Sequence, residues 1–229
     1  RFTFLSERNI YAIGSLVFCI AAFFSAGFHH FDEHFQILEF AAYKMGLVPV
    51  SNLPWEYEFK MRSGIQPIMV FSICKFSKVL GLYNPFYIST FFRLLSATVS
   101  FAATVFCLNT FIKEIKTQQA KNLALLLSFF LWFGIYNAVR FSSENWSAIF
   151  FLTSLCVGYA PTTLKRNLLL AGLLSGFSFL FRFQAGFLIA GLGAWLLFIK
   201  KESIINLLAF ACGFTFAFCI GALADKWFY

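Results

Sequence analysis

The polar segment HHFDEHFQ, residues 29–36, directly follows the apolar run YAIGSLVFCIAAFFSAGF. Its two acids, Asp32 and Glu33, are side chains that can accept a proton from a hydroxyl group. His29 and His30 can hydrogen-bond to a ligand's hydroxyl groups, or they can simply be solvated at the end of the apolar run. A concentration of ionisable groups at this boundary indicates a candidate reaction site.

Three arginines farther along the chain supply the opposite charge, namely Arg62, Arg140 and Arg182. A guanidinium group can contact two oxygens of a phosphate or carboxylate at once. Arg182 lies between two apolar stretches, where an unpaired guanidinium would be energetically costly. It is therefore expected either to bind a phosphate group or to form an ion pair with Glu144 or Asp225.

The sequence does not indicate a metal site or a bound cofactor. Histidine and acidic residues share one loop, but they lack a recognised ligand spacing, which leaves a divalent metal only weakly suggested. The six cysteines all lie in apolar stretches without a CxxC pair, so we interpret them as small packing residues. No cofactor and no metal ligand are predicted.

The composition indicates a polytopic membrane protein. Hydrophobic residues make up 60% of the 229 residues and charged residues 12%, whereas soluble domains carry about 25% charged residues. So little polar surface cannot cover a soluble domain, but a membrane protein can expose apolar sides to lipid. The net charge of +8 is spread between apolar runs, and no aromatic-basic nucleic-acid motif occurs, so we predict no nucleic-acid partner.

Seven apolar runs are long enough to cross a bilayer as helices, if the shorter ones pack inside a bundle. We therefore predict an all-α polytopic membrane protein, with residues 1–229 forming a single module. No internal repeat and no soluble domain are recognisable. The predicted spans are 9–28, 86–112, 122–138, 146–161, 167–181, 183–199 and 203–222.

The basic residues predict the orientation of these spans. The short connections KEIKTQQAK, TTLKRN and KKES follow the second, fourth and sixth spans, and Arg1 and Arg8 precede the first. All of them then lie on one side, which the positive-inside rule assigns to the cytoplasm. The polar segment 29–36 and the turns NAVRFSSENW and FRFQ then lie on the external side.

One alternative treats residues 65–81 as a further span. This stretch contains Lys75 and Lys78, and its insertion would place KEIKTQQAK and TTLKRN outside. We favour an amphipathic helix at the membrane surface, where lysine stems can snorkel. A second surface helix is expected over about 33–46, so that 29–85 forms one long external loop containing two interfacial helices.

Several segments, in order along the chain, resemble those of the glycosyltransferase family 22 mannosyltransferases of the GT-C superfamily. They are HHFDEHFQILEFAAYKMG, PWEYEFKMRSGIQP, RFSSENWSA, FLFRFQ and DKWFY. The likeness covers nearly the whole chain. Phe31 and Phe183 depart from it, because each stands where the family pattern has proline, which loosens the local backbone restraint.

The resemblance implies the fold and the partners of the protein. The fold would be a GT-C module of about seven transmembrane helices, of which this chain looks like the N-terminal part, with the C-terminal part missing. The donor would be a polyprenyl or dolichyl phosphate sugar, most simply mannose, and the acceptor a glycolipid or glycan. The active site would face the periplasm or the lumen of the endoplasmic reticulum, from a bacterial inner membrane or an endoplasmic reticulum membrane.

The resemblance also implies roles for the polar residues. Asp32 would be the general base, with Glu33 beside it, and arginines 62, 140 and 182 would bind the donor phosphate. The residues expected to bind substrate are His30, Gln36, Trp55, Glu144, Asn145 and Asp225. The alternatives are a transporter, which would want polar groups near the bilayer midplane, and a non-catalytic membrane assembly protein.

The predicted orientation can be tested by single-cysteine labelling in a cysteine-free background. A cysteine replacing Gln118 should react only from the cytoplasmic side, and cysteines within 29–85 only from the external side, because this arrangement alone satisfies the charge bias. Labelling of position 118 from outside would instead make 65–81 a membrane crossing.

Overall fold

The computed structural model describes residues 7–28, 30–82, 84–160 and 165–229. Arg1, His29 and residues 161–164, on which parts of the predictions above fall, lie outside the described residues. The described residues form helices, turns and loops, without a β-strand among them, so the all-α prediction is confirmed. They divide into two compact units, one of residues 7–27 and 89–141 and one of residues 28–88 and 142–229.

Among the described residues, three helices are long and apolar enough to cross a membrane, namely Glu7–Phe24, Pro85–Glu114 and Ile204–Phe228. A shorter apolar helical run covers Phe183–Ile199. These helices identify an integral membrane protein. Helices also occupy the other predicted spans, but they are only 13 to 17 residues long where they are continuous, so the count of seven crossings remains a prediction.

The first unit contains α1 (Glu7–Phe24), α6 (Gln118–Phe130), α7 (Trp132–Ala138) and most of α5 (Pro85–Phe111). Phe129 is fully buried in its core and makes edge contacts with the ring of Tyr11 and packs on that of Phe101. The predicted span 122–138 is not one helix. Leu131 is extended (φ −72°, ψ 117°), which breaks the helix there although the apolar pattern continues through the break.

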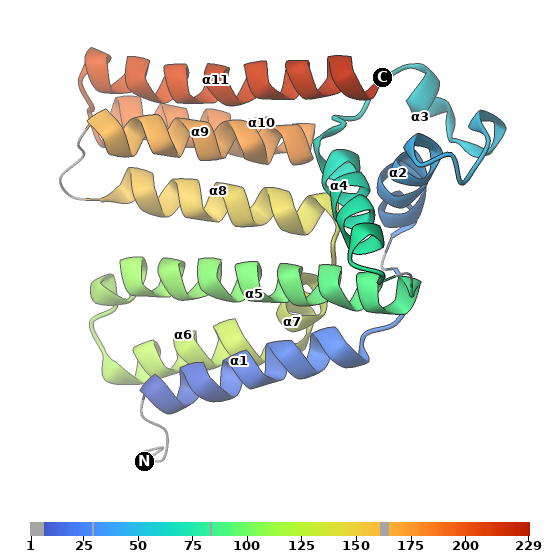
Figure 1. Cartoon of the computed structure of the whole chain (residues 1–229). Helices are drawn as coiled ribbons and strands as arrows, with labels where there is room; N and C mark the ends of the chain where they lie inside the picture. The colour runs from blue at the N-terminus through green and yellow to red at the C-terminus, as the bar shows by residue number, and fades with distance from the viewer. Residues whose placement is uncertain (1–6, 29, 83, 161–164) are drawn as a thin grey trace. The chain divides into compact units, whose positions relative to one another are not determined.

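The second unit contains three helices that lie side by side, with α9 (Lys165–Phe181) between α8 (Ser143–Tyr159) and α11 (Ile204–Phe228) (Figure 1). Glycines allow the backbones of α9 and α11 to touch. A Cβ added at Gly172 would lie 1.9 Å from the carbonyl oxygen of Phe210, and one added at Gly213 would lie 2.0 Å from that of Leu169. Such small-residue contacts are typical of helix packing in membranes, where apolar burial alone drives no association.

Buried serine hydroxyls join α8 to α9 on the opposite side of α9. Ser154 donates to the carbonyl oxygen of Ala171 (2.7 Å), and Ser147 donates to that of Ser178 (2.9 Å). After α9, the chain continues through η4 (Phe183–Ala185), α10 (Gly186–Ala194) and the π-helical η5 (Trp195–Ile199). The serine hydrogen bonds hold α9 against α8, and Arg182 directly follows the last residue of α9.

The predicted external loop belongs to the same unit and is itself helical. It contains η1 (Glu33–Leu38, a π-helix), α2 (Glu39–Lys44), η2 (Val50–Asn52), α3 (Trp55–Glu58) and α4 (Ile65–Val79). Helices therefore occur where surface helices were predicted. α4 contacts both α9 and α11 and begins near the C-terminal end of α11 (Figure 1), and its Phe76 and Val79 are exposed. Their placement at the membrane surface remains a prediction.

The close packing of α9 on α11 predicts that Gly172→Ala destabilises the protein. The added methyl group meets backbone atoms that cannot rotate away, and overpacking of this kind costs about 1–3 kcal/mol. Gly193→Ala is the matched control, because a Cβ at Gly193 meets no atom within 4 Å. Thermal unfolding in detergent should show a lower midpoint for Gly172→Ala alone. Equal midpoints for the two variants would contradict this packing.

Candidate active site

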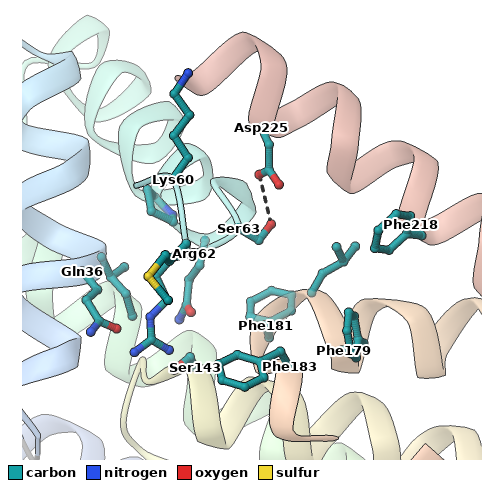
Figure 2. Close-up of a pocket in the computed structure, with 15 residues that line it drawn as sticks. Gln36, Lys60, Arg62, Ser63, Ser143, Phe179, Phe181, Phe183, Phe218 and Asp225 are labelled. Carbon is teal, nitrogen blue, oxygen red and sulfur yellow. Dashed lines mark hydrogen bonds between the residues drawn. The ribbon is translucent and has the colours of Figure 1, made fainter. Parts of the chain in front are cut away.

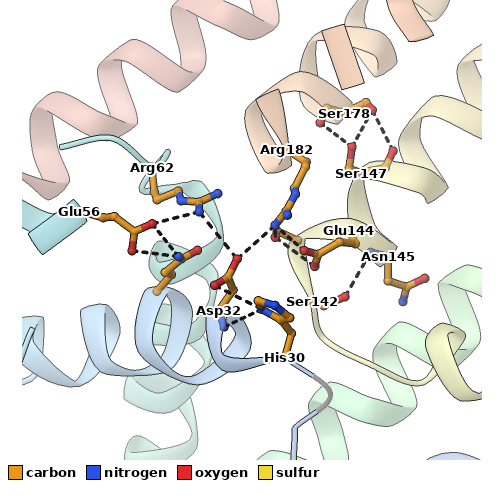
Figure 3. Close-up of polar contacts among 12 residues, drawn as sticks. His30, Asp32, Glu56, Arg62, Ser142, Glu144, Asn145, Ser147, Ser178 and Arg182 are labelled. Atoms are coloured by element: carbon orange, nitrogen blue, oxygen red, sulfur yellow. Dashed lines mark hydrogen bonds and ion pairs between the residues drawn. The ribbon is translucent and has the colours of Figure 1, made fainter. Parts of the chain in front are cut away.

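The carboxylate of Asp32 lies between two guanidinium groups (Figure 3). Its Oδ2 is 3.3 Å from Nη1 of Arg182 and 3.7 Å from Nη2 of Arg62, while Oδ1 is 3.3 Å from Nδ1 of His30. The Asp32 side chain is 18% exposed, so these interactions are only partly screened by solvent. Segments separated by about 150 residues of sequence thus meet at one carboxyl group.

Arg62 is held by a second acid, Glu56, at the start of α3. Nη2 of Arg62 is 3.1 Å from Oε1 of Glu56, and the Gln36 amide donates to both oxygens of that carboxylate at 2.9 Å. Gln36 itself is buried on η1. Because Glu56 is bound from both sides, it fixes the direction in which the Arg62 guanidinium points.

Arg182 is held by the acid at the start of α8. Its Nη1 forms an ion pair with Oε1 of Glu144 and lies 3.3 Å from Oγ of Ser143. Arg182 is the first residue after α9 and is extended, which turns its side chain out of the helical path. Ser142 caps α8, because its hydroxyl oxygen accepts a hydrogen bond from the backbone amide of Asn145 (3.2 Å). The negative charge of Glu144, in the first turn of α8, interacts favourably with the helix dipole.

A pocket shares Gln36, Arg62 and Ser143 with these contacts, although Asp32, Arg182 and Glu144 are not among the residues that line it (Figure 2). Its polar wall includes Gln36, Arg62, Ser143 and Asp225, and its other wall is aromatic. The aromatic side chains are Phe179, Phe181, Phe183 and Phe218. A ligand with a charged head and an apolar tail would find a suitable surface for each part.

Asp225, near the end of α11, joins the pocket to the start of α4. Its Oδ1 accepts hydrogen bonds from the amide of Gly64 (2.6 Å) and the hydroxyl of Ser63 (3.2 Å). Nearby, the Tyr229 hydroxyl donates to the carbonyl oxygen of Arg62 (2.7 Å). Burial, and then the negative charge of Asp225, raise the pKa of Tyr229, so this phenol remains a hydrogen-bond donor. Both residues anchor the segment that carries Arg62.

The structure brings together most of the predicted site residues, but not all of them. Glu33 is buried beside Asp32, and His30 lies at the outer edge of the ion pairs. Trp55 is 61% exposed, packs against Phe59 and does not line the pocket. The Asn145 amide participates in the cap of α8.

Arg140 belongs to the first unit, where it contacts the backbone that follows α1. Its Nη1 donates to the carbonyl oxygens of Ala26 (3.2 Å) and Gly27 (2.8 Å), just beyond α1, and its guanidinium lies over the ring of Tyr136. Binding of a donor phosphate by Arg140 remains a prediction.

The sequence analysis missed the pocket's aromatic wall and Ser143. Phenylalanine is the commonest aromatic residue in this chain, with 35 copies, so composition alone does not separate those that line a pocket from those that face lipid. The quoted segment FLFRFQ, which contains Phe179, Phe181 and Phe183, was the available signal for three of the four. Ser143 directly precedes Glu144 in the quoted segment RFSSENWSA, which was the available signal. Within the described residues, no three His, Cys, Asp or Glu side chains are grouped so as to hold a metal ion.

Comparison with known proteins identifies the family of this chain. The sequence model of the Alg9-like mannosyltransferase family matches residues 10–229, nearly the whole chain. The protein therefore belongs to the Alg9-like mannosyltransferase family and is a membrane glycosyltransferase. A search of curated proteins and a search of solved structures each found no match.

The hydrogen bonds to Asp225 predict that Asp225→Ala loosens the start of α4. It leaves the Gly64 amide without its acceptor, and an unsatisfied buried donor costs about 1–3 kcal/mol. Trypsin should then cleave more rapidly after Lys60 and Arg62 in the detergent-solubilised protein. Asp225→Asn retains an acceptor oxygen and serves as the control, with near wild-type cleavage expected. Wild-type cleavage of both variants would favour the predicted substrate contact instead.

Proposed function

We propose that the enzyme transfers a hexose, most simply mannose, from a polyprenyl phosphate to a hydroxyl group of a glycolipid or glycan. The observation that carries this proposal is the Asp32 carboxylate held between Arg62 and Arg182 beside a pocket with a polar and an aromatic wall. A base and two phosphate-binding groups within one site are what such a transfer requires. The resemblance of the external segments and the family assignment support the same donor class.

The chemistry assigns different roles to the two kinds of side chain. The acceptor oxygen attacks the anomeric carbon, and its proton passes to the Asp32 carboxylate. The bond between that carbon and the phosphate oxygen breaks, and the phosphate leaves with the bonding electron pair. Because this leaving group is a stable anion, it needs no proton, but Arg182 and Arg62 can stabilise its developing charge.

The pocket suggests how the donor lies. Its phosphate would contact the arginines, and the first isoprene units would pass along the phenylalanines toward lipid. Glu33 and His30 would position Asp32 and the acceptor. We further propose that this site faces the lumen of the endoplasmic reticulum or the periplasm, because the basic connections favour the cytoplasm for the opposite side.

The role of Asp32 predicts that Asp32→Asn abolishes transfer but not donor binding. Asparagine matches the shape of aspartate but cannot accept the proton, and loss of a general base costs about 10²–10⁴-fold in rate. The assay is sugar transfer from synthetic polyprenyl-phosphate mannose by the full-length enzyme in lipid nanodiscs. Glu33→Gln is the matched control, with a smaller loss expected.

Two outcomes would contradict this assignment. Wild-type rates for Asp32→Asn with an inactive Glu33→Gln would move the base to Glu33. Wild-type rates for both variants would exclude a base in this segment.

A further inference from the structure

The carboxylates of Asp32, Glu56 and Glu144 contact only two guanidinium groups in this site, those of Arg62 and Arg182. The contacts are most crowded at Arg182. A single nitrogen, Nη1, contacts Oδ2 of Asp32, Oγ of Ser143 and Oε1 of Glu144. A phosphate bound end-on, by Nη1 and Nη2 together, would need the same nitrogen. In that mode the donor phosphate takes the place of a resident oxygen at Nη1.

The three acids differ in how firmly they are held. Glu56 is 16% exposed and bound by both Arg62 and Gln36, and Asp32 is 18% exposed and contacts both arginines. Glu144 is 44% exposed, and its other hydrogen bond comes from the neighbouring Ser143 hydroxyl, at 3.3 Å. Of the three carboxylates, that of Glu144 is thus the one that water can most easily solvate when it separates from Arg182.

We infer that Glu144 is an internal competitor for the phosphate site: its carboxylate occupies Arg182 in the empty enzyme, yields to the donor phosphate, and returns to help expel the product. This inference rests on the proposed function. In the empty site Glu144 gives the partly buried Arg182 a second carboxylate partner beside Asp32. In the occupied site its negative charge stays near the phosphate and opposes its binding.

The competition acts more strongly on the product than on the donor. The donor is a phosphodiester with one negative charge, whereas the polyprenyl phosphate left after transfer is a monoester carrying about −1.5 to −2 at pH 7. Two arginines without a competing acid would therefore hold the product more tightly than the donor. Glu144 reduces this difference, since like-charge repulsion grows with the charge of the ligand.

The test is Glu144→Gln in the full-length enzyme in nanodiscs, assayed for mannose transfer with added polyprenyl phosphate. Donor KM should fall about two- to fivefold, the range that a partly exposed ion pair supports. The inhibition constant of polyprenyl phosphate should fall by a larger factor. Glu58→Gln is the matched control: it removes one charge from the exposed end of α3, where no ion pair to Arg62 or Arg182 is seen among the described residues.

The split between the two constants distinguishes competition from a purely structural ion pair. If Glu144 only positions Arg182, its loss raises KM and the inhibition constant together, and the inference is overturned. Unchanged constants in an enzyme whose wild type transfers mannose overturn it equally, but leave the proposed function standing. A wild type that neither transfers mannose nor binds polyprenyl phosphate overturns both.

A second variant tests the inference even if Glu144→Gln folds poorly. Glu144→Asp keeps the charge but withdraws the carboxylate by one methylene group, which weakens its contact with Arg182. The inhibition constant should then fall in the same direction by a smaller factor. A wild-type inhibition constant for Glu144→Asp would contradict the inference.

Discussion

The Oδ2 oxygen of Asp32 contacts the guanidinium groups of both Arg62 and Arg182, and the geometry of the site depends on this shared oxygen. Asp32 follows α1, Arg62 precedes α4, and Arg182 follows α9, so three connections between helices converge on it. None of the three groups is fully buried. The free energy of their interaction therefore lies between the small contribution of an exposed ion pair and the large cost of breaking a buried one.

The helices around the site restrict how far these charges can move. Gly172 and Gly213 bring α9 and α11 into backbone contact, while serine hydroxyls join α9 to α8. Near the C-terminal end of α11, Asp225 holds the start of α4. Arg182 thus directly follows a closely packed helix, whereas the Glu144 side chain is 44% exposed and retains the freedom to exchange partners.

The sequence predicted the class of fold and the members of the site better than their contacts. Apolar runs and flanking charges predict helices in a membrane. Ionisable residues beside an apolar run need solvent, a partner or a function, so Asp32 and Arg182 could be named as candidates. The hydropathy pattern does not predict the break in the helix at Leu131, because the residues on both sides of it are apolar.

The contacts that were not predicted depend on tertiary structure. Arg140 and Arg62 look equivalent in sequence, yet one contacts backbone carbonyls in the first unit and the other contacts acids in the second. Likewise, the pairing of Asp225 with the Gly64 amide joins residues 161 positions apart. No local pattern of residues specifies such a partner, since any nearby donor would satisfy the same carboxylate.

The most direct test of this account is a structure, by electron cryomicroscopy, of the full-length enzyme in nanodiscs with polyprenyl phosphate bound. The account predicts the phosphate within hydrogen-bond distance of Arg182, the Glu144 carboxylate turned away from that guanidinium, and Asp32 facing the space left for the acceptor. A phosphate bound elsewhere, with Arg182 still paired to Glu144 and Asp32, would contradict it.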